Sequence, residues 1–448
     1  MLMLLFKRIL LFASVCLMHA SQVYAQQETT LQFLTWVPQA NYTDLTIQPK
    51  EYRTSISLPF IGSMQAYYFN SAFKYNTLVN ENIIYPNNVI PSLKKQNQLY
   101  SGGSFDLFSM RFKKKDTYFQ FSIRDVWTQR FVYPYDLTNL IWNGNSAYAG
   151  QTADLSNTRI ALNYYREFGF AFNKSINDKL IIGSRVKFLT GLANITTQES
   201  ETSLYTDPNG LSISGHSEFT LLSSGLVNDE VIKTNDIIGF GNVGAALDVG
   251  GRYKLNEKLS LACNVINIGF IHWAKDVKNY RVNGDYTYTG YQIRDSVDIA
   301  NADWQNVLDT LEAVFKPTED SDKYNSWLSP TVYLSGNYML KENINLYSSL
   351  ALDVYHAVIP AFTVGATHTF HKVIQTTLNY TIMPNNYLNI GGGFAVRGGP
   401  FQYYMSCDNI IAVFDPYSVK YFNARLGLNI VLGRKEKNGK VDVPRISD

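Results

Sequence analysis

Residues 421–432 read YFNARLGLNIVL, and every second residue from Phe422 to Leu432 is apolar. Because successive side chains of a β-strand point to opposite faces, this segment has one apolar face and one polar face. Many segments of the chain repeat the pattern without a matching set of core helices. Together they predict an all-β fold, a transmembrane antiparallel β-barrel whose outer face contacts lipid and whose inner face contacts water or a plug.

The first 25 residues have the features of a secretory signal peptide. Lys7 and Arg8 precede the apolar run Ile9 to Leu17, and Val23-Tyr24-Ala25 fits the small-residue pattern before a cleavage site. We therefore expect the mature chain to begin at Gln26. Beyond this segment there is no uninterrupted apolar run of the ~18 residues that a membrane helix requires, so strands would have to hold the protein in the cell outer membrane.

Composition agrees with a barrel. Aromatic residues make up 14% of the chain, with 31 Tyr and 26 Phe, and such residues form girdles at the bilayer interface. The 39 basic and 37 acidic residues give a formal net charge of +2, which provides no support for a nucleic-acid partner. We expect outer-membrane lipid to be the main surrounding partner.

The alternation predicts about 14 strands, within a range of 12 to 16, and an even number is usual in bacterial barrels. They lie near residues 64–75, 104–112, 117–133, 158–173, 178–190, 240–254, 258–272, 329–340, 343–354, 360–370, 372–382, 386–397, 400–412 and 420–432. Every second link is short, and we interpret these as periplasmic turns around Gly62, Lys114, Ser175, Asn256, Glu342, His371 and Gly399. The long links, 76–103, 134–157, 191–239 and 273–328, are then extracellular.

The longest of these links contains the one predicted helix. Apolar residues recur there at helical spacing after a cap at Asn301, and Pro317 ends the pattern; they are Trp304, Val307, Leu308, Leu311 and Phe315. A helix with one apolar stripe must pack on something, so we expect it to fold over the barrel mouth. A loop-stabilising element and a ligand lid are both compatible with it.

Residues 26–60 precede the predicted barrel, residues 61–433. They are too apolar for a solvated tail, and the candidates for a plug inside the lumen are Leu31, Phe33, Leu34 and Trp36. An extra strand near Arg53 to Pro59, paired on the barrel edge or crossing inside, is the competing interpretation. After the last strand, residues 434–448 are polar and predict a periplasmic tail.

Two motifs suggest chemistry that their context does not support. Gly239-Phe240-Gly241-Asn242-Val243-Gly244 spells a dinucleotide fingerprint, but a strand pattern follows it where a helix would be needed. His368 and His371 are three residues apart and lack further ligands at metal-binding spacing. With no nucleophile motif either, we expect neither an enzyme, nor a metal, nor a cofactor.

Charged residues whose strand phase turns them inward are the lumen-facing polar candidates, and they would form a structural network in the lumen or, as the less favoured alternative, a substrate path. They are Glu167, Arg185, Lys187, Asp248, Arg252, Asp353, Asp408 and Arg425. Both signs are present, which favours pairing across the lumen over a selectivity filter of one sign. Arg166 does not fit, because it falls on the apolar face with Phe168 and Phe170; a bulge, an interfacial position or a register error would explain it.

Several stretches resemble a family of Bacteroidota outer-membrane barrels known as domain of unknown function 5723. They are Ser57-Leu58-Pro59-Phe60, Asn70-Ser71-Ala72-Phe73, Trp142-Asn143-Gly144-Asn145, Tyr165-Arg166-Glu167-Phe168, Arg185-Val186-Lys187-Phe188-Leu189-Thr190-Gly191 and Asn267-Ile268-Gly269-Phe270-Ile271-His272-Trp273. The resemblance covers most of the chain and implies a barrel in the outer membrane. It implies no activity.

Two functions are compatible with this architecture. The first is a plugged channel or transporter for small or hydrophobic molecules, by analogy with the plan of fatty-acid transporter barrels. The second is a scaffold that anchors surface or secreted proteins, like accessory barrels of the type IX secretion system. The corresponding partners are a hydrophobic small molecule or a secreted or surface protein.

Overall fold

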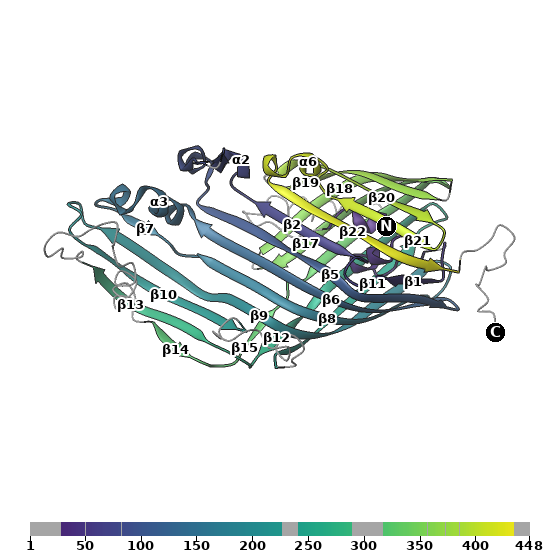
Figure 1. The fold of residues 1–448 in the computed structure, drawn as a ribbon, viewed down its shortest axis with the longest axis horizontal. Helices are drawn as coiled ribbons and strands as arrows, with labels where there is room; N and C mark the ends of the chain where they lie inside the picture. The colour runs from purple at the N-terminus through teal and green to yellow at the C-terminus, as the bar shows by residue number, and fades with distance from the viewer. Residues whose placement is uncertain are drawn as a thin grey trace, which may run out of the picture.

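The computed structural model describes residues 28–49, 51–81, 83–225, 241–288, 317–355, 357–371, 373–384 and 386–433. The chain folds into a closed antiparallel β-barrel of 14 strands (Figure 1). The first wall strand consists of two pieces, β1 (Thr54–Ser57) and β2 (Met64–Asn70). The others are β5 (Gln96–Lys114), β6 (Thr117–Pro134), β8 (Arg159–Ser175), β9 (Leu180–Thr206), β11 (Val243–Lys254), β12 (Leu259–Trp273), β16 (Thr331–Lys341), β17 (Ile344–Tyr355), β18 (Ala357–Phe370), β19 (Ile374–Met383), β20 (Asn386–Gly398), β21 (Phe401–Cys407) and β22 (Tyr421–Leu432).

The barrel closes where its first and last strands pair. β1 and β2 are both antiparallel to β22, with Ser57 opposite Asn429 and Met64 opposite Leu426. On their other side both pieces pair with β5. This closure leaves no open sheet edge in the wall, as a barrel in lipid requires.

The outer surface is apolar, and its side chains follow the predicted alternation. On β8, Phe170 and Phe172 are exposed on the outside, whereas Glu167 and Ala171 are buried on the inside. Exposed Val186 and Phe188 continue the same face on β9. Among the described residues no helix is long and apolar enough to cross a membrane.

All 14 predicted strands are present, and most bounds agree within a few residues. The prediction of a turn at Gly62 is wrong. Residues 58–63 interrupt the first strand without reversing it, because β1 and β2 run in the same direction along β5 and β22. Pro59 cannot donate to a sheet ladder, and Phe60 has a positive φ of 63°. The segment therefore bulges, and Phe60 and Ile61 are exposed on the outside.

The same observation corrects the predicted boundary between plug and barrel. β1 belongs to the wall, and Arg53 already donates from its backbone to Leu432. The luminal segment thus ends before residue 53 and not at residue 60. The competing interpretation, an extra strand near Arg53 to Pro59 on the barrel edge or crossing inside, is right that a strand is present, but β1 is part of the first wall strand and pairs on both sides.

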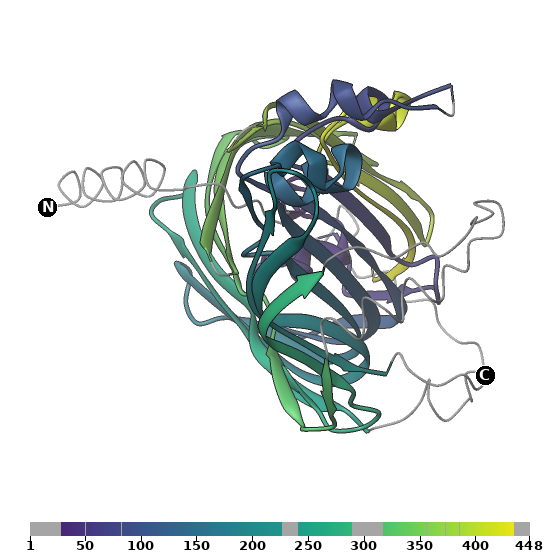
Figure 2. The same ribbon diagram turned by 90° about the vertical axis from the view of Figure 1, so that its left-hand side faces the viewer.

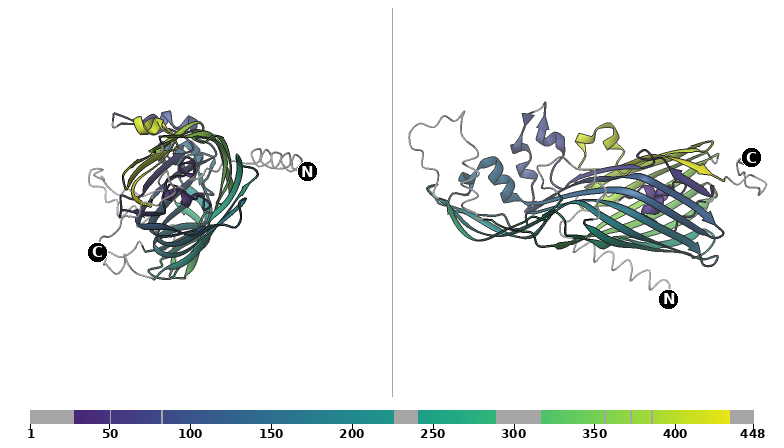
Figure 3. Two further views of the ribbon diagram at one scale, coloured as in Figure 1. Left: turned by 90° about the vertical axis from the view of Figure 1, so that its right-hand side faces the viewer. Right: turned by 60° about the horizontal axis from the view of Figure 1, so that its bottom comes forward.

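The wall continues beyond the barrel at the end that carries the long loops. β9 is 27 residues long, where only residues 178–190 were predicted as strand. Its first half pairs with β11 and its second half pairs with β10 (Ile213–Ser224). β13 (Asn279–Tyr288), β14 (Thr318–Asp320) and β7 (Thr152–Asp154) extend this projecting sheet (Figure 1; Figure 3, right).

The connections carry the remaining short elements. These are α2 (Tyr75–Leu78), α3 (Tyr135–Asn143), α6 (Ile411–Phe414), β3 (Val79–Asn80), β4 (Ile83–Ile84), β15 (Tyr324–Trp327), and 3-10 turns at Pro86–Asn88, Ile90–Ser92, Asn145–Tyr148 and Pro416–Ser418. The sequence patterns did not predict the three α-helices. The predicted helix at 301–317, the signal peptide and the tail at 434–448 lie outside the described residues, except for Pro317.

Candidate functional site

Residues 28–49 lie inside the barrel, and we refer to them as the plug segment. The segment contains two 3-10 helices, η1 (Leu31–Phe33) and η2 (Pro38–Tyr42), surrounded by the strands (Figure 2). The structure places all four plug candidates in the interior, each no more than 8% exposed. Leu31 and Leu34 join a cluster with wall residues Ala395 and Tyr404, and Phe33 stacks on Tyr347.

The plug segment is also tied to the wall by polar contacts. The Gln39 amide donates to Asn429 Oδ1 at 2.9 Å and to Ser57 Oγ at 2.7 Å, so it bonds to both strands of the closing pair. The Asn173 amide donates to the carbonyl of Leu45 at 2.8 Å. Similar contacts reach most of the wall strands. Since each single hydrogen bond contributes only about 1 kcal/mol, the attachment depends on their number.

Tyr42 connects the plug segment to charged residues of the wall. Its hydroxyl donates to Asp106 Oδ2 at 2.9 Å. The guanidinium groups of Arg124, Arg185 and Arg425 lie 3.8, 5.1 and 5.6 Å from the centre of its ring. Cations over an aromatic face are attracted to it, and the attraction is greater when water is excluded. Tyr42 therefore holds three wall cations of β6, β9 and β22 around the plug segment.

The predicted inward charges all lie in the barrel interior. Seven of the eight are buried, and Arg252 is partly exposed. The ion pairs that they form include Arg185–Asp248 at 3.1 Å, Lys187–Asp248 at 2.9 Å, Lys187–Glu167 at 3.5 Å, Arg124–Glu167 at 3.8 Å, Arg130–Asp353 at 3.6 Å, Arg425–Glu28 at 2.7 Å and Arg252–Asp44. Asp408 instead accepts hydrogen bonds from the backbone N–H groups of Thr29 and Thr30.

The pairing differs in one respect from the prediction. Most of these pairs join neighbouring strands or join the wall to the plug segment, whereas Arg130–Asp353 crosses the lumen from wall to wall. Because each of these cations lies beside an anion, the described interior charges form no region of a single sign that would select ions by charge alone.

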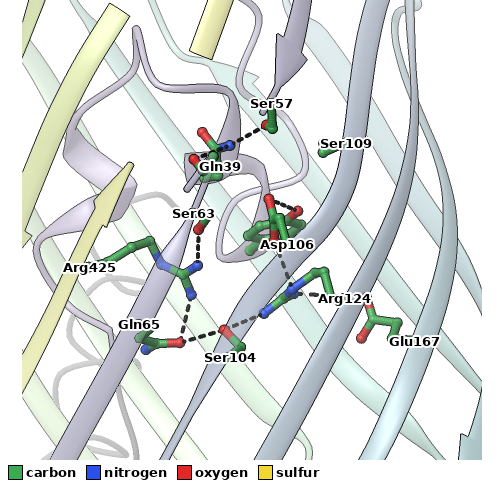
Figure 4. Close-up of polar contacts among 12 residues, drawn as sticks. Gln39, Ser57, Ser63, Gln65, Ser104, Asp106, Ser109, Arg124, Glu167 and Arg425 are labelled. Carbon is green, nitrogen blue, oxygen red and sulfur yellow. Dashed lines mark hydrogen bonds and ion pairs between the residues drawn. The ribbon is translucent and has the colours of Figure 1, made fainter. Parts of the chain in front are cut away.

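Polar contacts link five neighbouring strands beside the plug segment (Figure 4). Arg425 donates to Gln65 Oε1 at 2.6 Å, and Ser104 donates to the same oxygen at 3.2 Å. Arg124 then donates to Ser104 at 3.1 Å and lies 3.8 Å from Glu167. This chain of contacts runs from β22 through β2, β5 and β6 to β8.

Sequence reasoning missed several of these residues. Arg124 and Arg130 have the inward phase on β6, opposite to Phe119 and Phe121, so the alternation could have identified them. Asp106 was obscured by an irregularity of register between Asp106 and Phe108. Glu28 and Asp44 lie in a segment without strand periodicity, which offered no such signal.

Arg166 faces outward, as its strand phase indicates. Asp125 lies directly opposite it on β6, and the two form a bidentate pair at 2.7 and 2.9 Å. The Tyr164 hydroxyl also bonds to Asp125 at 3.2 Å. Asp125 explains why Arg166 can lie on the apolar face, because a paired charge there costs far less free energy than a single charge.

A cavity of about 140 Å³ lies in the interior beside the plug segment. Its lining combines plug residues with charged and aromatic wall residues. They include Glu28, Tyr42, Tyr67, Tyr100, Arg124, Arg130, Tyr165, Glu167, Lys187, Tyr333, Asp353 and Arg425. The lining thus offers aromatic rings, hydroxyl groups and charges of both signs to a small molecule.

The lumen narrows again at the end of the barrel that carries the long loops. Phe69 and Tyr100, on β2 and β5, cluster with Ala361 and Met383, on β18 and β19, together with Tyr421. Three strands, β20 to β22, separate β19 from β2 in the wall, so these contacts cross the interior. We call this cluster, together with the Arg130–Asp353 pair, the upper constriction.

The described residues of the motifs set aside in the sequence do not line the cavity. From Val243 the chain forms β11, so a strand and not a helix follows the glycine motif, whose first two residues lie outside the described ranges. In the described part of the chain, no group of three or more His, Cys, Asp or Glu side chains is placed to hold a metal ion.

The closed antiparallel wall with an occupied lumen defines a β-barrel of the outer-membrane kind. The chain belongs to the family of unknown function DUF5723, whose model matches residues 47–408. None of the curated proteins matches it.

The barrel is similar to several solved structures. One is the Pseudomonas putida toluene transporter TodX, with 8% identity and a TM-score of 0.41 over 88% of this chain and 94% of that one. A Pseudomonas aeruginosa FadL homologue has 9% identity and a TM-score of 0.41 over 90% and 98% of the two chains. The Ralstonia pickettii toluene transporter TbuX has 8% identity and a TM-score of 0.34 over 88% and 93%. Such distant likeness says nothing about the cargo of this chain.

Proposed function

We propose that this chain is a plugged channel of the outer membrane that moves small molecules, hydrophobic ones among them, and has no catalytic role. The observation that supports the proposal is a cavity in the interior that is bounded on two sides. The plug segment, through Glu28 and Tyr42, bounds the cavity on one side, and the upper constriction, through Tyr100 and the Arg130–Asp353 pair, bounds it on the other.

The kind of contact at both closures fits a barrier that opens. Beside their apolar clusters, both closures contain hydrogen bonds or ion pairs, which can be exchanged for contacts with water or with cargo. The plug segment is joined to β1 through a short link, so it could leave the lumen without breaking the wall.

Single-channel conductance of the refolded protein in a planar bilayer tests the proposal. One variant lacks residues 28–49, which spares β1. A second, Arg130→Gln with Asp353→Asn, neutralises the upper pair while keeping similar side-chain volumes, and a third combines both changes. We expect no steady conductance from the unaltered chain and the largest conductance from the combined variant.

The outward-facing Asp125–Arg166 pair on β6 and β8 provides a matched control. Asp125→Asn with Arg166→Gln makes the same chemical change on the lipid side of the wall and should leave conductance unchanged. Folding of each variant is checked by heat-dependent gel mobility. If every variant is folded and none conducts, the channel proposal is wrong.

The projecting sheet favours a second candidate function, a scaffold for surface or secreted proteins in a Bacteroidota outer membrane. β10 and β13 pair over nine residues beyond the barrel, which presents a broad surface to a protein partner. Crosslinking in isolated outer membranes tests this candidate. A stoichiometric protein partner that is lost when the β10 and β13 strands are shortened would support the scaffold and weaken the channel proposal.

A further inference from the structure

We propose that the cavity binds a small zwitterion, a net-neutral molecule with an anionic and a cationic group. This inference rests on the channel function proposed above and names its cargo. It starts from the charges of the lining, which occur as neighbouring pairs of opposite sign. Arg130 lies 3.6 Å from Asp353, and Arg425 lies 2.7 Å from Glu28.

The size of the cavity limits the cargo. A cavity of about 150 Å³ in another protein holds a benzene molecule, and this one measures about 140 Å³. A cargo that fits this cavity therefore has the size of one small ring or of a small amino acid. Tyr42, Tyr67, Tyr100, Tyr165 and Tyr333 surround it with aromatic faces and hydroxyl groups.

The position of Arg130 and Asp353 determines the charge of the cargo. They stand on β6 and β17, which are separated by five wall strands on the shorter way around, so a molecule that enters through the upper constriction must part them. Arg130 also lies over the Tyr100 ring at 4.4 Å, which holds the guanidinium at its own wall. Parting the pair without replacement takes an ion-pair partner away from each charge, and Asp353 is only 2% exposed.

A zwitterion avoids this cost because its two groups replace the two lost partners. Its carboxylate would accept from the Arg130 guanidinium, and its ammonium would donate to Asp353. A simple anion or cation would compensate one side alone, and a hydrocarbon would compensate neither. The balance of signs elsewhere in the lining, with Lys187 and Arg124 beside Glu167, also disfavours a cargo with net charge.

Four probes of one ring size test the inference by isothermal titration calorimetry on the full chain in detergent micelles. They are L-proline, cyclopentanecarboxylate, pyrrolidine in its protonated form, and cyclopentanol. We expect L-proline to bind at least about 10-fold more tightly than the other three, since it alone makes both charge-assisted contacts.

Two double variants test whether the preference for L-proline arises in the cavity. Arg130→Gln with Asp353→Asn should remove the preference for L-proline, and the outward control Asp125→Asn with Arg166→Gln should retain it. Equal affinity for all four probes, tighter binding of cyclopentanol, or no binding of L-proline would overturn the inference. Because the channel function is tested by conductance of the combined variant, a conducting pore together with any of these results would refute the zwitterion alone.

Discussion

Arg425 should be the most sensitive anchor of the plug segment. It donates to both carboxylate oxygens of Glu28, at 2.7 and 3.2 Å, and to Ser63 and Gln65, each at 2.6 Å. Arg425→Gln leaves Glu28 buried without this cation, and breaking a buried ion pair from one side costs about 3–5 kcal/mol. If the plug segment detaches as a unit, its detached fraction rises roughly 100- to 4,000-fold, since about 1.4 kcal/mol is a factor of ten.

Thiol labelling measures this fraction. Ala40 is fully buried in the plug segment, so Ala40→Cys, in a chain with Cys263→Ser and Cys407→Ser, reacts with a maleimide only after detachment. The labelling rate should rise with Arg425→Gln and rise much less when Glu28→Gln is added, because the second change removes the unpaired charge. Labelling of the single variant at the rate of the unaltered chain, or equal rates for the single and double variants, would refute the reasoning.

Three other changes test the neighbouring contacts. Tyr42→Phe removes one buried hydrogen bond and should raise thiol labelling roughly 5- to 140-fold, from a cost of about 1–3 kcal/mol. Gly183→Ala should also raise labelling, because a Cβ there would lie 2.7 Å from a backbone oxygen of the plug segment; Gly251→Ala, where a Cβ meets nothing within 4 Å, is its control. Arg166→Gln leaves Asp125 unpaired on the outer face and should lower the free energy of unfolding in liposomes by about 3–5 kcal/mol, with labelling unchanged.

The wall could be predicted from the sequence because its two environments differ strongly. Lipid outside and polar groups inside make apolar and polar side chains alternate along each strand. The sequence of residues 421–432 shows this alternation directly. The predicted inward phase of Arg185 and Arg425 follows from the same rule, and both lie in the interior.

Features that depend on contacts between distant strands leave no pattern in the local sequence. Pro59 and Gly62 have the composition of a turn, yet pairing with β5 and β22 keeps the chain running forward. The upper constriction depends on how closely β2 and β5 approach β18 and β19, which no single segment encodes. Tyr42 gave no signal because the plug segment, whose regular elements are two short 3-10 helices, has no strand period to detect.

The plug segment has a consequence for the order of assembly. Glu28 contacts Arg425, 397 residues later in the chain, and Gln39 bonds to Asn429 on the strand that completes the wall. Contacts this distant in sequence form slowly, and these sites do not exist until β22 has paired with β1. Leu31 and Leu34 therefore remain uncovered while the wall is built, a period in which apolar segments aggregate unless a chaperone covers them. The residues translated before the barrel are thus among the last to reach their native contacts.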